Sequence, residues 1–179
     1  MYKNEFDNYL KQNKKFKAYM FYGQSIFLVE QYALVIAQSL GNDDEIEKLY
    51  FEEYDFKYTK DKLLQSSLFS SNNIILIKID KKIPKKEVDS LIEACNLNPD
   101  STLIFACLGD SDFKTMEASF SLKTNSAAVR FFLPTDTEAI KFLEYEAKML
   151  NMKVESSALN HLYFMHKNDL ALCVNDMKK

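Results

Sequence analysis

The loop that follows the first apolar run of the chain stands where nucleotide-binding proteins hold phosphate. In an α/β sheet this loop needs glycines, so that backbone N–H groups can approach the phosphates, and its P-loop form ends in Gly-Lys-Ser/Thr. Here the loop spans residues 22–26 and reads YGQSI, with Gly23 as its one glycine and no lysine. None of the three glycines of the chain precedes a lysine. We therefore expect no phosphate-binding site.

Two further residues have types that nucleotide hydrolysis uses, but their surroundings are unsuitable. Asp80 ends the apolar run IILIKID, where a P-loop ATPase carries a magnesium-binding aspartate followed by a glutamate. Lys81 follows it instead, so we interpret Asp80 as a cap or turn residue. Arg130 is the only arginine and falls inside a predicted strand, which argues against a transition-state arginine finger from this chain.

The histidines and cysteines form no catalytic or metal-binding pattern. His161 and His166 are five residues apart, so a helix places them on different faces, and there is no His-Glu-x-x-His motif. Cys95, Cys107 and Cys173 lie in apolar segments without a Cys-x-x-Cys pair, which indicates core positions in a reducing compartment. We expect no metal, no cofactor and no intrinsic enzymatic activity. The pattern favours a binding or scaffolding protein.

The segment Gln65–Phe69 is a candidate contact for a partner protein. It reads QSSLF, and further serines follow at positions 70 and 71. Small polar residues around the pair Leu68 and Phe69 would suit a projecting hydrophobic plug that fills a partner's pocket. The alternative is that both side chains fold back into the core.

The densest positive run of the chain is a cluster of lysines around residue 82. Acidic residues follow at once, at Glu87 and Asp89, so a solvated face is the favoured interpretation. A nucleic-acid contact is the alternative. The lysines concerned are Lys78, Lys81, Lys82, Lys85 and Lys86.

The composition is that of an ordinary globular chain. Its 179 residues carry 26 acidic and 23 basic side chains, for a formal net charge of -3, and 47% of the residues are hydrophobic. A chain of this length buries enough surface to fold without disulfides or metals. No apolar run approaches 20 residues and no leader pattern stands at the N-terminus. We expect a cytoplasmic protein that does not insert into a membrane.

Strand and helix patterns alternate over the first three quarters of the chain. Five apolar runs, at residues 18–23, 48–54, 72–80, 101–109 and 127–134, predict strands. Helices are predicted at 4–14, 26–40, 59–69, 85–96 and 111–121, with Ser25 and Thr59 as N-caps. This order predicts an α/β domain, residues 1–134, with a parallel sheet covered on both faces. Residues 135–179 show only helical spacing, with Thr135 or Asp136 as the first cap, and predict a small helical domain.

The order of these segments resembles the delta subunit of bacterial DNA polymerase III, the clamp-loader subunit that opens the sliding clamp. The first similar stretch, residues 22–30, reads YGQSIFLVE after the first strand. The second, residues 67–77, reads SLFSSNNIILI, and the third, residues 167–175, reads KNDLALCVN. Together the three stretches extend over nearly the whole chain.

The resemblance implies an AAA+-type fold, with a five-stranded parallel sheet and a three-helix lid, that binds no ATP itself. It implies that Leu68 and Phe69, flanked by Gln65, contact the clamp. Where active AAA+ proteins keep a sensor arginine in the lid, this chain has Ala171. The family also adds a C-terminal helical collar, which is absent here, so we expect this chain to be a fragment or a short form.

The hypothesis is therefore a non-catalytic clamp-loader subunit that binds and opens the DNA sliding clamp during replication, as part of the DNA polymerase III holoenzyme. Its expected partners are the beta clamp and the delta prime and gamma/tau subunits, with DNA reached indirectly. Lys81, Lys82, Lys85 and Lys86 are the residues that would contact nucleic acid. Two alternatives stay open: a degenerate ATPase-fold scaffold, and a nucleic-acid-binding module without a clamp contact.

Overall fold

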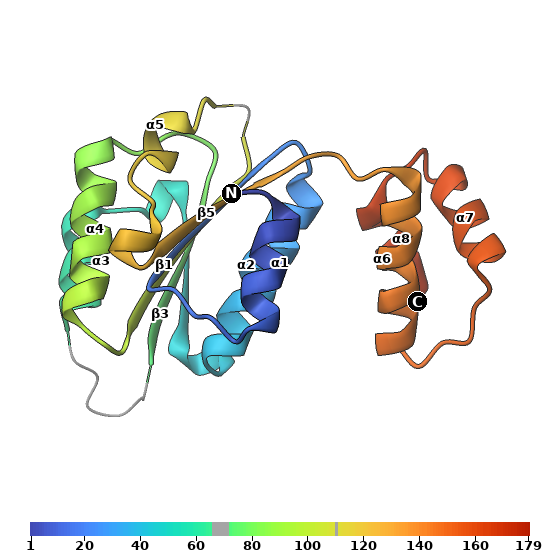
Figure 1. The fold of residues 1–179 in the computed structure, drawn as a ribbon, viewed down its shortest axis with the longest axis horizontal. Helices are drawn as coiled ribbons and strands as arrows, with labels where there is room; N and C mark the ends of the chain where they lie inside the picture. Colours follow the sequence, from blue (N-terminus) through green and yellow to red (C-terminus); the bar gives the residue numbers. More distant parts are fainter. Residues whose placement is uncertain (66–71, 110) are drawn as a thin grey trace. The chain divides into compact units, whose positions relative to one another are not determined.

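The computed structural model describes residues 1–65, 72–109 and 111–179, and the chain divides into two compact units, Met1–Phe131 and Phe132–Lys179. The first unit is built on a five-stranded sheet with the order β2-β3-β4-β1-β5 (Figure 1). All four strand pairs are parallel, which confirms the predicted parallel five-stranded sheet. The strands are β1 (Ala18–Gly23), β2 (Ile46–Tyr50), β3 (Asn73–Ile79), β4 (Ser101–Cys107) and β5 (Ser126–Phe131).

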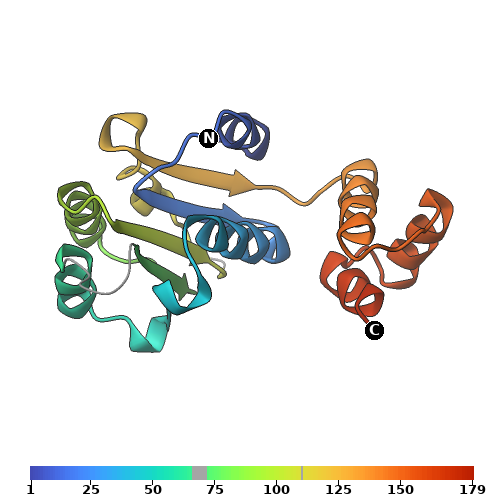
Figure 2. The same ribbon diagram turned by 90° about the horizontal axis from the view of Figure 1, so that it is seen from below.

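Helices cover both faces of the sheet, as Figures 1 and 2 show. Helices α1 (Lys3–Lys11) and α2 (Ile26–Leu40) lie on one face, and α3 (Phe56–Leu64) and α4 (Lys85–Leu97) lie on the other. The short helix α5 (Lys114–Glu117) follows β4. Because both faces are covered, the inner strands are apolar at nearly every position, and all seven residues of β4 are buried.

Aromatic rings fill the face beneath α1. The ring centroids of Phe6 and Phe21 are 5.5 Å apart, and those of Tyr32 and Phe131 are 4.8 Å apart. The Tyr32 hydroxyl also donates a hydrogen bond of 2.8 Å to Asp7 Oδ1, so that α1 is fixed to α2. Burial, followed by the Asp7 carboxylate, raises the pKa of Tyr32, so the hydroxyl keeps its proton at neutral pH.

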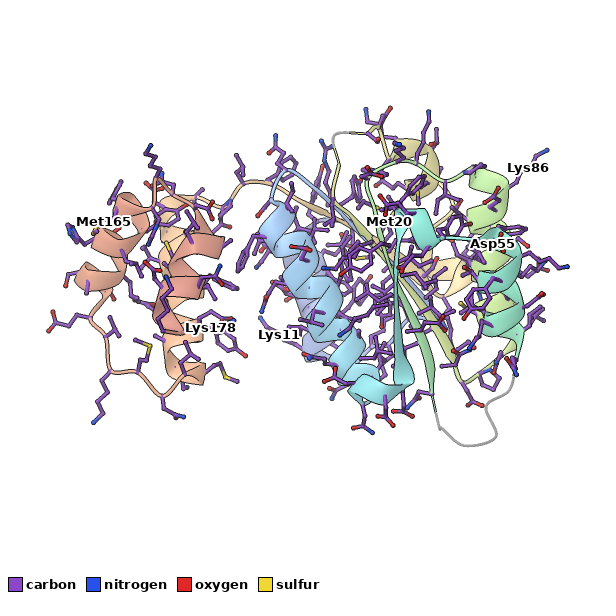
Figure 3. The ribbon with its side chains drawn as sticks, turned by 180° about the vertical axis from the view of Figure 1, so that it is seen from behind. Lys11, Met20, Asp55, Lys86, Met165 and Lys178 are labelled. Atoms are coloured by element: carbon purple, nitrogen blue, oxygen red, sulfur yellow. The ribbon has the colours of Figure 1, made fainter. Side chains whose placement is uncertain are left out.

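The opposite face holds a hydrophobic core that includes Met20 of β1, which is labelled in Figure 3. Helix α4 buries Val88, Leu91, Ile92 and Cys95 there, as its spacing predicted. The three cysteines are free and buried, which confirms their core positions. Burial raises the pKa of the Cys95 thiol to about 12, so this thiol is unreactive in the folded protein.

Several predicted element boundaries were wrong. The helix predicted at 4–14 ends at Lys11, the strand predicted at 127–134 ends at Phe131, and of the helix predicted at 111–121 only Lys114–Glu117 is α-helical. Helix α3 begins at Phe56 rather than at Thr59, because Asp55 Oδ1 accepts the N–H of Tyr58 at 2.6 Å and caps the helix (Asp55 is labelled in Figure 3). Thr59 is fully buried inside the helix. The predicted continuation of this helix through residues 66–69 lies outside the described residues.

Another wrong boundary is the end of β2, which stops at Tyr50 instead of continuing to residue 54. A single 3-10 turn, Phe51–Glu53, follows because the Glu53 carboxylate accepts the backbone N–H of Tyr50 at 2.8 Å. The bond turns the chain away from the edge of the sheet.

The second unit consists of three helices, α6 (Asp136–Met149), α7 (Ser156–Met165) and α8 (Leu170–Met177). Thr135 is the first cap, and it forms a capping box with Glu138. The buried side chains of the helices form a small core; they are Ala139, Leu143, Ala147, Leu159, Tyr163, Leu170, Cys173, Val174 and Met177. Within the described part of the chain, no helix is long and apolar enough to cross a membrane.

The connection from α7 to α8 holds two residues in the left-handed region. Lys167 has φ 52° and Asn168 has φ 66°, and Asp169 then caps α8 by accepting the N–H groups of Ala171 and Leu172. Asparagine tolerates this conformation better than lysine does, because its short polar side chain bonds locally. The KNDL stretch is therefore a turn and cap.

We predict that Lys167→Gly stabilises the second unit by about 0.5–1 kcal/mol, because glycine adopts positive φ without the steric penalty of a Cβ atom. The measurement is urea unfolding followed by circular dichroism. Lys148→Gly is the matched control: Lys148 is an exposed residue of α6, so glycine there should cost about 1 kcal/mol. Equal destabilisation by both changes would contradict the assignment of strain to Lys167.

Candidate functional site

The backbone of the loop between β1 and α2 is in direct contact with the end of β5. Gly23 has φ 137°, and a Cβ atom built there would overlap the carbonyl oxygen of Phe131. The next residue, Gln24, donates its backbone N–H to the same carbonyl at 2.8 Å. Gly23 is therefore required by the approach of two strands and not by a phosphate, since the first N–H after the strand is already bonded.

The start of α2 is a compact cap. Only Gln24 and Ser25 lie between β1 and α2. Ser25 is buried, and its hydroxyl accepts the N–H of Leu28 at 3.4 Å, as its predicted role as N-cap requires. A phosphate cradle needs a longer, glycine-rich loop whose N–H groups converge on an anion. This connection is too short to form one.

Asp80 lies beside the loop that follows β4. Its backbone carbonyl accepts the Ser111 hydroxyl at 3.0 Å, and a Cβ atom on Gly109 would overlap that same carbonyl. The neighbouring Lys78 forms an ion pair of 2.7 Å with Glu30 of α2. Over the described residues, no three His, Cys, Asp or Glu side chains come close enough together to hold a metal ion.

The one arginine lies in β5, the last strand in the order of the sheet. Arg130 of β5 is in register with Tyr22 of β1, and it is half-buried. Burial, then the carboxylate of Glu117, raises the pKa of Tyr22. The position of Arg130 within a strand agrees with the sequence expectation.

The lysine cluster spreads over the turn after β3 and the first turn of α4. Lys85 Nζ is 2.7 Å from Asp89 Oδ2, and this partner lowers the pKa of the Asp89 carboxyl. Lys81 Nζ lies 5.4 Å from the ring centroid of Phe51. Lys82 and Lys86 are exposed, and Figure 3 shows Lys86 directed away from α4. Lys78 and Lys85 are thus paired with carboxylates, whereas Lys82 and Lys86 are open to solvent and could face either water or a nucleic-acid backbone.

Gln65 lies at the end of α3, near the strand ends that are opposite to Asp80 and the lysine cluster. Its N–H bonds the carbonyls of Asp61 and Lys62, and its own carbonyl accepts the side-chain amide of Asn98 at 3.2 Å. The side chain of Gln65 is exposed. Leu68 and Phe69, the other two residues expected to contact a clamp, lie outside the described residues.

Sequence reasoning missed three exposed leucines near Gln65, which we call the apolar rim. Leu64 of α3 is 42% exposed, Leu97 of α4 is 70% exposed, and Leu122 is 50% exposed in a 3-10 turn, Leu122–Thr124. The Asn98 amide connects the ends of α3 and α4, and the Asn96 amide bonds the Thr124 carbonyl at 2.9 Å, so hydrogen bonds join the three segments that carry these leucines. The available signal was that Leu97 departs from the buried 88-91-92-95 face of its helix.

Comparisons with known proteins support the fold. A family model named HP_1247_M and described as a middle domain matches residues 135–179. Two curated proteins from Helicobacter pylori strains J99 and 26695 are 28% and 27% identical over the whole chain, which spans 58% of their length.

Two solved structures are similar over 98% of this chain. The Bacillus subtilis DNA clamp loader delta protein (YqeN) has 16% identity and a TM-score of 0.65, with 56% of that chain covered. The Thermotoga maritima RuvB Holliday junction branch migration motor has 13% identity and a TM-score of 0.55, with 59% covered. The first unit and the helices after it therefore have an AAA+-like fold, as expected from the sequence.

We predict that Gly23→Ala destabilises the protein by at least about 3 kcal/mol, because the new methyl group would meet the Phe131 backbone in a conformation that alanine avoids. Thermal unfolding provides the measurement. Gly41→Ala is the control: its φ of -168° suits any residue, and the new atom would meet the ends of the Glu45 and Ile74 side chains. A loss of less than 1 kcal/mol at Gly23 would mean that β1 and β5 are not in close contact there.

A nucleic-acid contact through Lys81, Lys82, Lys85 and Lys86 stays a prediction with a direct test. Changing all four to alanine should leave the affinity for duplex DNA and its dependence on salt unchanged if these side chains form a solvated face. Fluorescence anisotropy with a labelled duplex at several salt concentrations measures both. A tenfold weaker affinity with a shallower salt dependence would instead assign them to DNA.

Proposed function

We propose that this chain is a non-catalytic clamp-loader subunit that binds a DNA sliding clamp and favours its open form. The observation that carries the proposal is the fold: 98% of the chain superimposes on a protein described as a DNA clamp loader delta protein. The proposal extends to partners, which would be the beta clamp and the other clamp-loader subunits, delta prime and gamma/tau, in a cytoplasmic DNA polymerase III holoenzyme.

The closed loop after β1 supports a role without nucleotide hydrolysis. The Phe131 carbonyl accepts the backbone N–H of Gln24, and Ser25 is buried as the N-cap of α2. A subunit of this kind contributes binding surface, and ATP hydrolysis that cycles the complex must come from other subunits. Binding of ATP to this chain at sub-millimolar concentration would favour the alternative of a degenerate ATPase instead.

In this proposal, the clamp binds where α3 ends. Leu68 and Phe69 carry the contact in this proposal, and Gln65 flanks them. The apolar rim adds exposed apolar area at the same edge, which is typical of a protein-binding surface. Burial of the Leu68 and Phe69 side chains in a pocket would contribute about 3–6 kcal/mol before ordering costs.

The opening of the clamp follows from differential binding. A ligand shifts an equilibrium between two states only by the difference in its affinity for them. The subunit must therefore contact the clamp more extensively when one clamp interface is open than when the ring is closed. A rigid α/β unit suits this role, because it does not deform to fit both states equally well.

We predict that Leu68→Ala/Phe69→Ala weakens binding to the cognate sliding clamp at least tenfold, because the plug loses most of its apolar area. Isothermal titration calorimetry of the 179-residue chain against the clamp measures the affinity. Circular dichroism establishes that the variant is folded.

The control is Phe164→Ala/Met165→Ala, which removes an exposed apolar pair from α7, where the two residues are 59% and 66% exposed. This variant should bind the clamp as the wild type does. Equal binding by wild type and by the Leu68/Phe69 variant would place the contact elsewhere. If the wild type does not bind the clamp, the chain shares the fold of a clamp loader delta protein but not a clamp-binding function.

A further inference from the structure

Helix α6 ends in a turn that folds the chain back on the helix. Asn151 has φ 56°, in the left-handed region, and its N–H donates to the Lys148 carbonyl at 3.0 Å. The N–H of Met152 donates to the Ala147 carbonyl at 2.8 Å. These two bonds form a Schellman motif, which ends a helix and satisfies two of its last carbonyls. The connection from α6 to α7 therefore starts against the last turns of α6 (Figure 1).

A pocket of about 310 Å³ lies between the end of α6 and this connection. Its volume is within the range of pockets that hold ligands. Ala147 of α6 is buried and Val154 of the connection is half-buried, and both line the pocket. The residue after the left-handed position of a Schellman motif commonly packs on the helix. Met152 instead keeps 38% of its surface exposed and forms a third apolar wall.

The charged side chains that line the pocket are two lysines and one glutamate. The Ser156 hydroxyl, at the start of α7, donates to Glu144 Oε1, so this carboxylate is already bonded. Neither Lys148 nor Lys153 forms an ion pair in the parts of the chain that the structure describes. The pocket therefore combines apolar walls with uncompensated positive charge.

The helix itself accounts for only one of these two lysines. A lysine in the last turn of a helix offsets the negative end of the helix dipole, and Lys148 is in that position. Lys153 follows the helix and is exposed beside the pocket, where no described carboxylate pairs with it. Its charge is available to a ligand.

We propose that this pocket binds an acidic peptide segment of a partner protein. An apolar side chain of the segment enters the pocket, and carboxylates of the segment lie beside Lys148 and Lys153. The apolar anchor supplies most of the affinity, and the complementary charges select the segment. A peptide fits better than a small acid, because Met149 and Leu150, directly before the turn, are also exposed and a small acid inside the pocket would leave them uncovered.

The test is an NMR titration of the ¹⁵N-labelled 179-residue chain. The probes are three eight-residue peptides in which one Phe, Leu or Tyr stands between Asp and Glu residues. We expect at least one of them to shift the amide signals of residues 144–154, with a dissociation constant below about 1 mM. Peptides with Lys in place of the acidic residues should not shift these signals, because the two pocket lysines repel them.

Two pairs of variants separate charge from apolar contact. Lys148→Glu/Lys153→Glu should weaken binding at least about tenfold. Lys141→Glu/Lys178→Glu, which makes the same change in net charge at two exposed lysines outside the pocket, should weaken it less than about twofold.

Met152→Ala should weaken binding at least about threefold, because the pocket loses an apolar wall. Met165→Ala, at an exposed methionine of α7 outside the pocket, should have no effect. Circular dichroism establishes that each variant is folded. If Lys148→Glu/Lys153→Glu does not fold, Lys153→Glu alone replaces it, since this residue lies outside the helix.

The inference does not depend on the proposed function, because it concerns the second unit alone. Absence of shifts at residues 144–154 with all three acidic peptides at millimolar concentration would overturn it. Equal binding of acidic and basic peptides would overturn it as well, since the lysines would then not select the ligand. So would equal weakening by the two double lysine variants. None of these results bears on the clamp contact.

Discussion

The approach of Phe131 to the backbone of Gly23 determines what this sheet can do. Because the two strands touch at that point, the Gln24 N–H is bonded to a carbonyl, and the chain enters α2 after only two residues. The AAA+-like arrangement of sheet and helices is retained, but the edge where such folds hold phosphate is occupied by protein. The rigid core and the surfaces of the chain are then the parts that are available for a function.

In the proposed function, the contact surface lies at the other end of the strands. Helix α3 ends without a glycine, the Leu63 carbonyl is bonded by Asn98 and Ser101, and Leu64 in its last turn is exposed. In the proposed function, this edge binds the clamp, and the rigidity of the α/β unit converts binding into a preference for one clamp state. The closed loop and the contact edge are consistent with a subunit that works without its own nucleotide.

Most of the fold could be predicted from the sequence because burial on both faces of a parallel sheet leaves continuous apolar runs, such as IILI at residues 74–77. The predicted start of α3 was wrong because two residues could cap the helix equally well. Asp55 and Thr59 are both good N-caps, and only packing decides that Thr59 is buried. The hydrogen bonds of Asn98 and Ser101 to α3 could not be predicted, because the topology of the sheet brings these residues to the end of α3. The clamp-contact residues came from a family resemblance, and the described structure does not include Leu68 or Phe69.

The most direct test of the account is the release of a sliding clamp from circular DNA in the absence of nucleotide. A clamp loaded on a closed circle leaves it only when one interface of the ring opens, so release reports opening rather than mere binding. The purified chain should accelerate release without ATP, with a rate that saturates as the chain is added. Release that requires ATP, or no acceleration by a chain that nevertheless binds the clamp, would contradict it.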